Sequence, residues 1–172
     1  MRGLKLHVPA PSELGFRQRL MADPATMAYN RGCAPWDGCH PETGCIDFPE
    51  ADWREWYDYF VGNEPERWYA YIVRGDDGAR LGEVNVHRAS GHAWHDMGIV
   101  IDARYRGQGY AEPALRLLLD HAFREMGVAE IRNAFEPQRE AALKAHLACG
   151  FRILSEENGT VTLSLRKEEY PA

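Results

Sequence analysis

The sequence predicts one α/β (α+β) domain, residues 1–172, with a mixed, mostly antiparallel sheet and helices on its faces. Strand-like segments joined by turn residues over 68–102 predict an antiparallel meander. Apolar residues at helical spacing predict helices over 111–126 and 138–149, with a further strand between them. A hairpin is predicted over 151–165. Because 172 residues suffice for one sizeable core, no second domain is expected.

The N-terminal segment is less regular. Residues 4–8 alternate between apolar and polar side chains, and Pro9 stops the pattern, which indicates an edge strand. Ser12 is a candidate N-cap for a helix over 13–21. Asp23 and the proline after it are expected to end that helix.

The stretch 25–52 is irregular and rich in glycine, proline and aromatic residues. Loops of this length in a compact domain are usually functional or disordered, and here Trp36, Phe48 and the cysteines favour an ordered covering loop. A short helix through Phe60 follows, with Asp52 as its candidate cap. Its aromatic residues recur at helical spacing, which favours packing over ligand stacking. They are Trp53, Trp56, Tyr57 and Phe60.

The predicted meander contains three strands. Two of them, 68–74 and 80–88, flank residues 75–78, a Gly-Asp-Asp-Gly hairpin turn. The third, 92–102, follows a second turn and is apolar enough for an interior position. It leads directly into a glycine-containing loop, and Gly127 is expected to end the helix that follows this loop.

The loop Arg104–Ala111 separates the third strand from that helix. Backbone N–H groups converge at a helix N-terminus, glycines permit close approach, and the helix dipole adds positive potential. Arg104 and Arg106 add positive charge, so the loop predicts a site for a phosphate or pyrophosphate group. It lacks both the Gly-Lys-Ser/Thr ending of a P-loop and the third glycine of a dinucleotide fingerprint. Neither a nucleoside triphosphate nor a dinucleotide is therefore expected.

The run Arg106-Gly107-Gln108-Gly109-Tyr110-Ala111 resembles the pyrophosphate loop of the GNAT N-acetyltransferases, written Arg/Gln-x-x-Gly-x-Gly/Ala. The resemblance continues at flanking positions: Gly98, Ala114-Leu115, Pro137, Ala142 and Cys149-Gly150-Phe151. The pattern is similar to the branch that includes the ribosomal-protein alanine acetyltransferases. It covers roughly residues 68–166, whereas residues 1–67 show little of it.

The resemblance implies a GNAT-like sheet that splays beside the glycine-loop strand, with acetyl-CoA as cosubstrate in the opening and no metal. Residues 68–166 would form the acetyl-CoA-binding core, and residues 1–67 a variable acceptor-side region. The implied reaction is direct attack on the thioester by a primary amine of a small molecule or a protein N-terminus. The residues implied to contact acetyl-CoA are Ile99, Val100, Ile101, Arg106, Gly107, Gln108, Gly109, Tyr110 and Ala111. Arg139, which departs from the family pattern, is a further candidate contact.

Such an amine must lose a proton before it attacks. Two carboxylates on the strands before the loop are candidate bases. Asp96 stands where the alanine-acetyltransferase branch often carries an acid, and Glu83 lies among apolar neighbours that could raise its pKa. The nearby His87 and His95 are alternatives, because imidazole suits proton transfer near neutral pH.

The leaving thiolate needs a proton or a hydrogen bond. His146 stands four residues before Gly150, where many family members carry a tyrosine near the thiolate. It could donate the same proton, or it could lie on the outer face of its helix. Arg139 replaces a usual asparagine and could instead meet a phosphate. These two departures leave open a second class of protein, a catalytically inactive CoA-binding sensor or interaction module.

The formal net charge of −6 disfavours a nucleic-acid surface. It is consistent with a cationic acceptor and equally with a surplus of acid that only keeps the protein soluble. No apolar run approaches the length of about 20 residues that spans a membrane. The first residues lead into no long apolar stretch of the kind found in signal peptides. A cytoplasmic location without membrane contact is therefore expected, and homodimerisation is left open.

Cys33, Cys39 and Cys45 are evenly spaced, with His40 among them. Structural zinc sites usually pair cysteines at closer spacing, so a metal site is disfavoured. Disulfides are rare in cytosolic proteins, so free thiols in a loop are expected. Cys149, at the end of a predicted helix, is expected to pack in the core.

Overall fold

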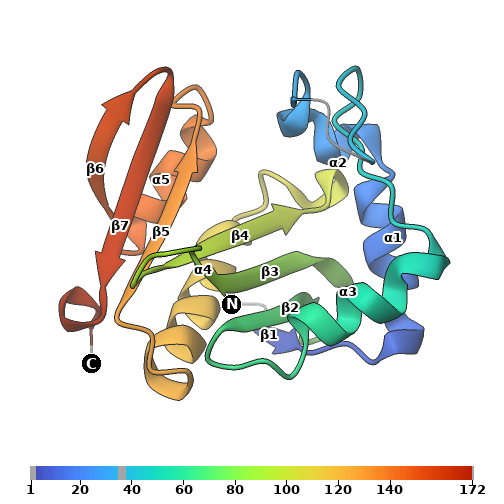
Figure 1. Cartoon of the computed structure of the whole chain (residues 1–172), viewed down its shortest axis with the longest axis horizontal. Coiled ribbons are helices and arrows are strands. Elements are labelled where there is room, and N and C mark those ends of the chain that lie inside the picture. Colours follow the sequence, from blue (N-terminus) through green and yellow to red (C-terminus); the bar gives the residue numbers. More distant parts are fainter. Residues whose placement is uncertain (1–2, 35–37, 172) are drawn as a thin grey trace.

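The computed structural model describes residues 3–34 and 38–171. Within these residues the strands form one seven-stranded sheet in the order β1-β2-β3-β4-β5-β7-β6 (Figure 1). The strands are β1 Leu4–His7, β2 Arg67–Arg74, β3 Arg80–Arg88, β4 His95–Ile101, β5 Glu130–Phe135, β6 Arg152–Glu157 and β7 Thr160–Arg166. The α-helices are α1 Gly15–Met21, α2 Pro24–Met27, α3 Trp53–Phe60, α4 Ala111–Asp120 and α5 Glu140–Ala148.

The sheet is antiparallel except between β4 and β5, which run parallel. That parallel ladder contains only two residue pairs, His95 with Ile131 and Asp96 with Arg132. On its other side β4 stays paired with β3 as far as Ile101. The strands β4 and β5 therefore diverge after Asp96, as Figure 1 shows. The predicted mixed, mostly antiparallel sheet with an opening beside the glycine-loop strand is confirmed.

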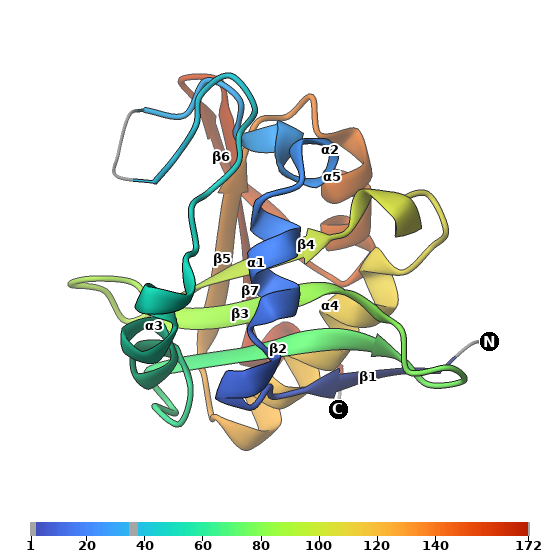
Figure 2. The same ribbon diagram turned by 90° about the vertical axis from the view of Figure 1, so that its right-hand side faces the viewer.

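Helices cover both faces of the sheet, as predicted, because alternate residues of a strand point to opposite faces. On one face Ala70 and Ile72 of β2 pack in the core that contains α4. On the other face Tyr69 and Tyr71 pack against α1 and receive aromatic side chains of α3. Figure 2 shows α1 crossing in front of the strands with α4 behind them. The strand β2 is consequently buried on both sides.

Turn chemistry places the hairpins where the sequence predicts them. The terminal hairpin turns at Asn158 and Gly159, which have φ of 51° and 75°. Two consecutive positive φ values are the geometry of a two-residue type I′ turn. Gly127, with φ of 70°, follows the last helical residues after α4, also as predicted. A π-helical turn, His121–Glu125, lies between α4 and Gly127. None of the described helices is long and apolar enough to cross a membrane.

The predicted capping hydrogen bonds of Ser12 and Asp52 in the N-terminal segment are not formed. Ser12 lies inside a 3-10 turn, Pro11–Glu13, and α1 begins at Gly15 without a side-chain cap. Helix α1 ends at Met21, just before Asp23, as predicted. Asp23 accepts hydrogen bonds from the N–H groups of Ala25 and Thr26 and so caps α2. The residue predicted to cap α3, Asp52, also makes no capping hydrogen bond. A 3-10 turn precedes both helices. Helix α3 nevertheless begins directly after Asp52, the residue predicted at its start, whereas α1 begins at Gly15 rather than at residue 13.

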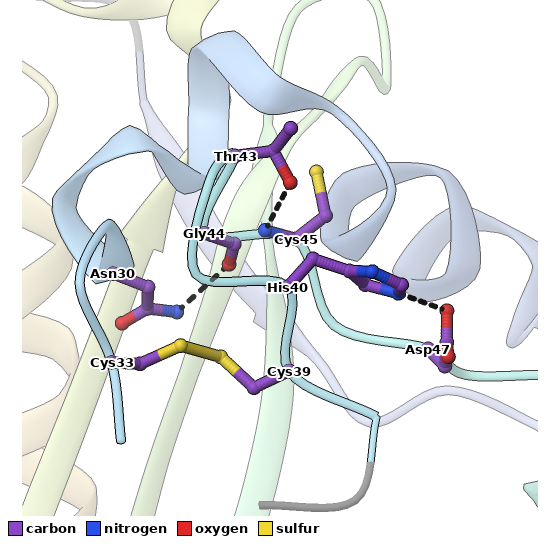
Figure 3. The surroundings of a disulfide bond; sticks show 8 residues. All are labelled: Asn30, Cys33, Cys39, His40, Thr43, Gly44, Cys45 and Asp47. Atoms are coloured by element: carbon purple, nitrogen blue, oxygen red, sulfur yellow. Dashed lines mark hydrogen bonds and ion pairs between the residues drawn. A yellow bond between two sulfur atoms is a disulfide. The ribbon is translucent and has the colours of Figure 1, made fainter. Parts of the chain in front are cut away.

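The prediction of free thiols is wrong for two of the cysteines. Cys33 and Cys39 form a disulfide (Figure 3). The loop folds back on itself, with the N–H of Gly32 donating to the carbonyl of Pro41, and this return brings the two sulfur atoms together. Cys45 is free and half-buried. Among the described residues, no group of three His, Cys, Asp or Glu side chains could hold a metal ion.

The covering loop is described except at residues 35–37, so the expectation for Trp36 lies outside the described residues. Phe48 is buried, with its ring 5.3 Å from that of Trp56. Trp56 also packs edge-on against Tyr69 at 4.7 Å, which confirms that the aromatic stripe of α3 is a packing surface. Cys149 is buried as predicted, and burial raises the pKa of its thiol to about 11.

Candidate active site

Two adjoining cavities open where β4 leaves β5. The larger cavity, about 750 Å³, lies between the end of β4, the glycine loop and α5, and Gly107, Gly109 and Lys144 are among its lining residues. The smaller cavity, about 420 Å³, lies between α1, β3, β4 and β5, and Arg17 and Glu83 are among its lining residues. Six residues line both cavities and are called the junction here: Tyr29, Ile99, Val100, Arg139, Ala142 and His146.

The glycine loop forms one wall of the larger cavity. Gly107 and Gly109 have φ of 73° and 80°, a conformation that side-chain-bearing residues rarely adopt. A Cβ built on either glycine would meet no protein atom within 4 Å. Tyr110 and Ala111 at the start of α4 also line the cavity, so a helix N-terminus faces it. This arrangement suits a phosphate or pyrophosphate group.

Three polar side chains of the loop bind neighbouring protein groups. The guanidinium of Arg106 donates to the carbonyls of Thr26, Ala25 at 3.1 Å and Ile101 at 3.0 Å. Arg104 pairs with Asp102 at 2.6 Å. Both arginines therefore hold the loop in place. The charge of Arg104 is paired with Asp102, whereas Arg106 has only neutral carbonyl partners among the described residues, keeps its positive charge and lines the larger cavity, as expected. The side chain of Gln108 donates to the carbonyl of Arg104, and Gln108 does not line the cavity.

The β4 segment Ile99–Ile101 lines the larger cavity, as expected. These residues lie beyond the last β4–β5 pair, so the β5-side edge of their main chain faces the opening. The residue before this segment, Gly98, has to be a glycine, because a Cβ there would lie 2.5 Å from the side-chain nitrogen of Asn85. Because Gly98 has no side chain, the side chain of Asn85 can lie over it, and Asn85 lines the smaller cavity.

Glu83 lies in the wall of the smaller cavity and is 3% exposed. One of its carboxylate oxygens pairs with Arg17 and the other accepts a hydrogen bond from the Tyr69 hydroxyl. The Arg17 guanidinium stacks on aromatic rings, 4.5 Å from the centroid of Trp56 and 5.1 Å from that of Phe48. The candidate base is therefore a buried carboxylate whose counter-ion comes from α1.

Asp96, the other predicted acid, is placed differently. In the sheet register Asp96 stands opposite His87 of β3 and Arg132 of β5, at the closed end of the opening. It lines neither cavity. His95 is buried, with Nε2 2.8 Å from the carbonyl of Pro65. Burial lowers the pKa of His87. The structure thus brings Glu83 to the site, whereas these three residues lie outside both cavities.

His146 is 1% exposed and lies at the junction, so its placement on an outer helix face is wrong. Nδ1 lies 2.7 Å from the carbonyl of Ala142, and because a carbonyl only accepts, Nδ1 carries the proton. Nε2 then accepts from the amide nitrogen of Asn133 at 3.0 Å. The Asn133 oxygen accepts from the N–H of Ala134, which fixes the amide orientation. The ring is therefore neutral, and burial lowers its pKa.

This neutral ring makes stability depend on pH. The folded pKa of His146 lies below the ordinary 6.5, so in acid the unfolded chain binds a proton that the folded chain does not. The contribution of His146 to the free energy of unfolding is fully present above its unfolded pKa and decreases as the pH falls below that value. Urea unfolding between about pH 7 and pH 5 should show a flatter pH dependence for His146→Gln than for the wild type. Parallel slopes in the two proteins would contradict a buried neutral His146.

The predicted candidates omitted several residues that shape the smaller cavity. Arg17 and Tyr29 come from the N-terminal segment, where no motif or spacing marks them. Asn133 lies on β5, and nothing in that strand's pattern indicates its contact with His146. Asn85 could have been found, because it lies two residues after Glu83 on β3 and residues at that spacing share a face of the sheet.

Residues 4–152 match the family model described as an acetyltransferase (GNAT) domain. This match covers most of the chain, and the protein belongs to the GNAT acetyltransferase family. The predicted family is confirmed, and the closer likeness to the ribosomal-protein alanine acetyltransferases stays a prediction. The match begins well before residue 68, where the recognisable motifs start.

The uncharacterized N-acetyltransferase YnaD of Bacillus subtilis (strain 168) is 24% identical over 105 residues, 61% of each chain. The chain thus spans about three-fifths of that relative's length. A GNAT-family acetyltransferase from Bacillus anthracis has a TM-score of 0.72 at 18% identity, with 98% of this chain and 97% of that one covered. A spermidine N-acetyltransferase from Vibrio cholerae, solved with CoA and spermine, has a TM-score of 0.76 at 16% identity, with 97% of each chain covered. These structures share the fold.

Proposed function

We propose that the protein is an acetyl-CoA-dependent N-acetyltransferase that transfers the acetyl group to a primary amine by direct attack. The observation that carries this proposal is the junction, where a cavity with a glycine loop meets a cavity with a buried carboxylate. One cavity suits the diphosphate and arm of a nucleotide thioester, and the other suits a cationic acceptor. The two reactants would therefore meet at the residues that both cavities share.

The larger cavity fits CoA on several grounds. The positive-φ glycines Gly107 and Gly109 leave space for a diphosphate beside the α4 N-terminus. Lys144 and Arg139 add cationic side chains along α5. The exposed main-chain edge of Ile99–Ile101 can pair with the amides of the pantetheine arm, as an added strand would. The solved Vibrio cholerae spermidine acetyltransferase, which shares the fold, contains CoA. Acetyl-CoA is the cosubstrate that this arrangement supports.

Glu83 is our choice for the general base. An ammonium group entering the smaller cavity must lose a proton before nitrogen can form the new bond to the acetyl carbon. Each Glu83 oxygen accepts one hydrogen bond, which leaves each with capacity for another. Asp96 would require a relay, because it lies at the closed end of the opening. Residues 1–67 supply Arg17 and Tyr29 to this cavity, which supports their role as an acceptor-side region.

A small-molecule amine is the acceptor class that we favour. A volume of about 420 Å³ accommodates a small amine, and its walls carry the carboxylates of Glu83 and Glu136. The Vibrio cholerae relative of the same fold was solved with spermine, a small polyamine. A protein N-terminus is the other acceptor consistent with a primary amine, and both fit a protein working in the cytoplasm.

Release of free CoA thiol from acetyl-CoA tests the proposal. The panel contains monoamines, spermidine, spermine and a peptide with an N-terminal alanine, and small amines are expected to yield thiol fastest. In parallel, acetyl-CoA at 100 times its Kd should stabilise the protein by about 2.7 kcal/mol, whereas ATP with magnesium and NAD should not. Stabilisation by acetyl-CoA without thiol release from any amine would instead support an inactive CoA-binding module.

A further inference from the structure

Three of the six junction residues carry polar side chains. Ile99, Val100 and Ala142 are apolar, which leaves Tyr29, Arg139 and His146 to contact a reacting group there. When an amine displaces a thioester, the C–S bond breaks and sulfur keeps the electron pair. A donor that faces the developing negative charge on sulfur lowers the barrier, because it is already in place when the charge appears.

His146 has no proton to offer the junction. Its Nδ1–H is held by the Ala142 carbonyl, and its Nε2 lone pair accepts from Asn133. Its ring also packs between Phe135 and Phe151, with centroids 5.2 and 5.1 Å away. The histidine that replaces a family tyrosine therefore acts as a support for the wall of the cavity, and another group must face the sulfur.

Tyr29 has the free hydroxyl that His146 lacks. It lies in a 3-10 turn, Ala28–Asn30, after α2, and is half-buried. Its hydroxyl makes no hydrogen bond to any other residue that the structure describes, although Tyr29 lines both cavities. Burial raises its pKa above the ordinary 10, so the hydroxyl keeps its proton throughout the physiological range. It is thus a donor without a partner at the place where the cavities meet.

The surroundings fix the position of Tyr29. The guanidinium of Arg139 lies over its ring, 4.7 Å from the centroid. The next residue, Asn30, donates to the carbonyl of Gly44 at 3.4 Å. Gly44 lies so close to the turn that a Cβ there would be 2.1 Å from the carbonyl oxygen of Met27. The part of the covering loop around Gly44 therefore packs against this turn and fixes the position of Tyr29 at the junction.

We propose that the Tyr29 hydroxyl donates a hydrogen bond to the CoA sulfur as it leaves. This inference rests on the proposed acetyl transfer. The phenol keeps its own proton, because phenols have a pKa of about 10 and thiols of about 8.5. Nitrogen forms the C–N bond as sulfur departs with the C–S electron pair. Conversion of the ammonium to an amide releases two protons, of which one ends on sulfur and the other in solvent.

Binding of CoA and of its sulfur-free analogue, desulfo-CoA, tests the inference without any acceptor. Titration calorimetry of the wild type should show a preference for CoA that grows between about pH 7 and pH 9, as the thiol ionises. Tyr29→Phe should reduce this preference by roughly tenfold at the upper pH, in line with a hydrogen bond to a charged group. The exposed Tyr59, outside both cavities, provides the matched control: Tyr59→Phe should keep the wild-type ratio.

The same variants have an expected effect on turnover. Tyr29→Phe should lower kcat by roughly 10–100-fold with little change in KM for acetyl-CoA, because the bond forms only as charge develops. A Tyr29→Phe protein with wild-type kcat and a wild-type CoA to desulfo-CoA ratio would overturn the inference. Loss of the preference in Arg139→Met but not in Tyr29→Phe would overturn it too and move the donor to Arg139. Failure of the wild type to bind CoA would instead refute the proposed function.

Discussion

Replacing Glu83 with glutamine is expected to lower the free energy of unfolding by about 3–5 kcal/mol. The Glu83 side chain is 4% exposed and that of its partner Arg17 15% exposed, so water cannot take over the lost interaction. An amide keeps the shape of the carboxylate but not its charge. Arg17 would remain as a cation among aromatic rings without a counter-ion, which is the costly state of a broken buried ion pair.

Urea denaturation measures this effect, and two further variants isolate its cause. Arg17→Met combined with Glu83→Gln removes both charges and should recover at least half of the lost stability, because no charge is left buried. Glu66→Gln breaks the exposed pair with Arg88, whose side chain is 41% exposed, and should cost less than about 1 kcal/mol. Equal losses for Glu83→Gln and Glu66→Gln would refute the buried-pair account.

Measurements of kcat separate the catalytic role of Glu83 from its role in stability. The double variant should remain slow although it is stable, with kcat lowered by roughly 10²–10⁴ if general-base catalysis is lost. Recovery of both stability and kcat in the double variant would leave Glu83 as a partner of Arg17 only. The base would then have to come from Asp96 through a relay, or from water.

Local signals predicted the features that depend on neighbouring residues. The glycine loop, the hairpin turn at Asn158 and the helix end at Gly127 were predicted because positive φ selects glycine or asparagine within a few residues of chain. The opening of the sheet was implied by the family resemblance. The CoA side of the site follows from these elements, since one strand, one loop and one helix N-terminus build most of it.

The acceptor side could not be predicted because its contacts join distant parts of the chain. Arg17 and Glu83 are 66 residues apart, and neither position shows a pattern that indicates the other. The exact register of β4 against β5 decides that Asp96 lies at the closed end of the opening. The Cys33–Cys39 disulfide was missed because the return of the loop, rather than cysteine spacing, brings the sulfur atoms together.

Gly109→Val is expected to weaken CoA binding by tenfold or more, equivalent to at least about 1.4 kcal/mol. Gly109 has φ of 80°, and a β-branched residue strongly disfavours that conformation. No protein atom lies within 4 Å of the added Cβ, so the effect does not come from a clash inside the protein. It comes from a changed loop backbone and from side-chain atoms in the space where a diphosphate would approach the N–H groups. Titration calorimetry with CoA measures the change.

Gly127→Val provides a control with the same backbone strain at a different place. Gly127 has φ of 70°, its Cβ would also meet no atom within 4 Å, and it lines neither cavity. Both variants should lose about 1–3 kcal/mol of stability from the strained backbone, but only Gly109→Val should lose CoA affinity. A folded Gly109→Val protein that binds CoA as tightly as Gly127→Val does would show that the anion does not lie on this loop. The assignment of the larger cavity to CoA would then be lost.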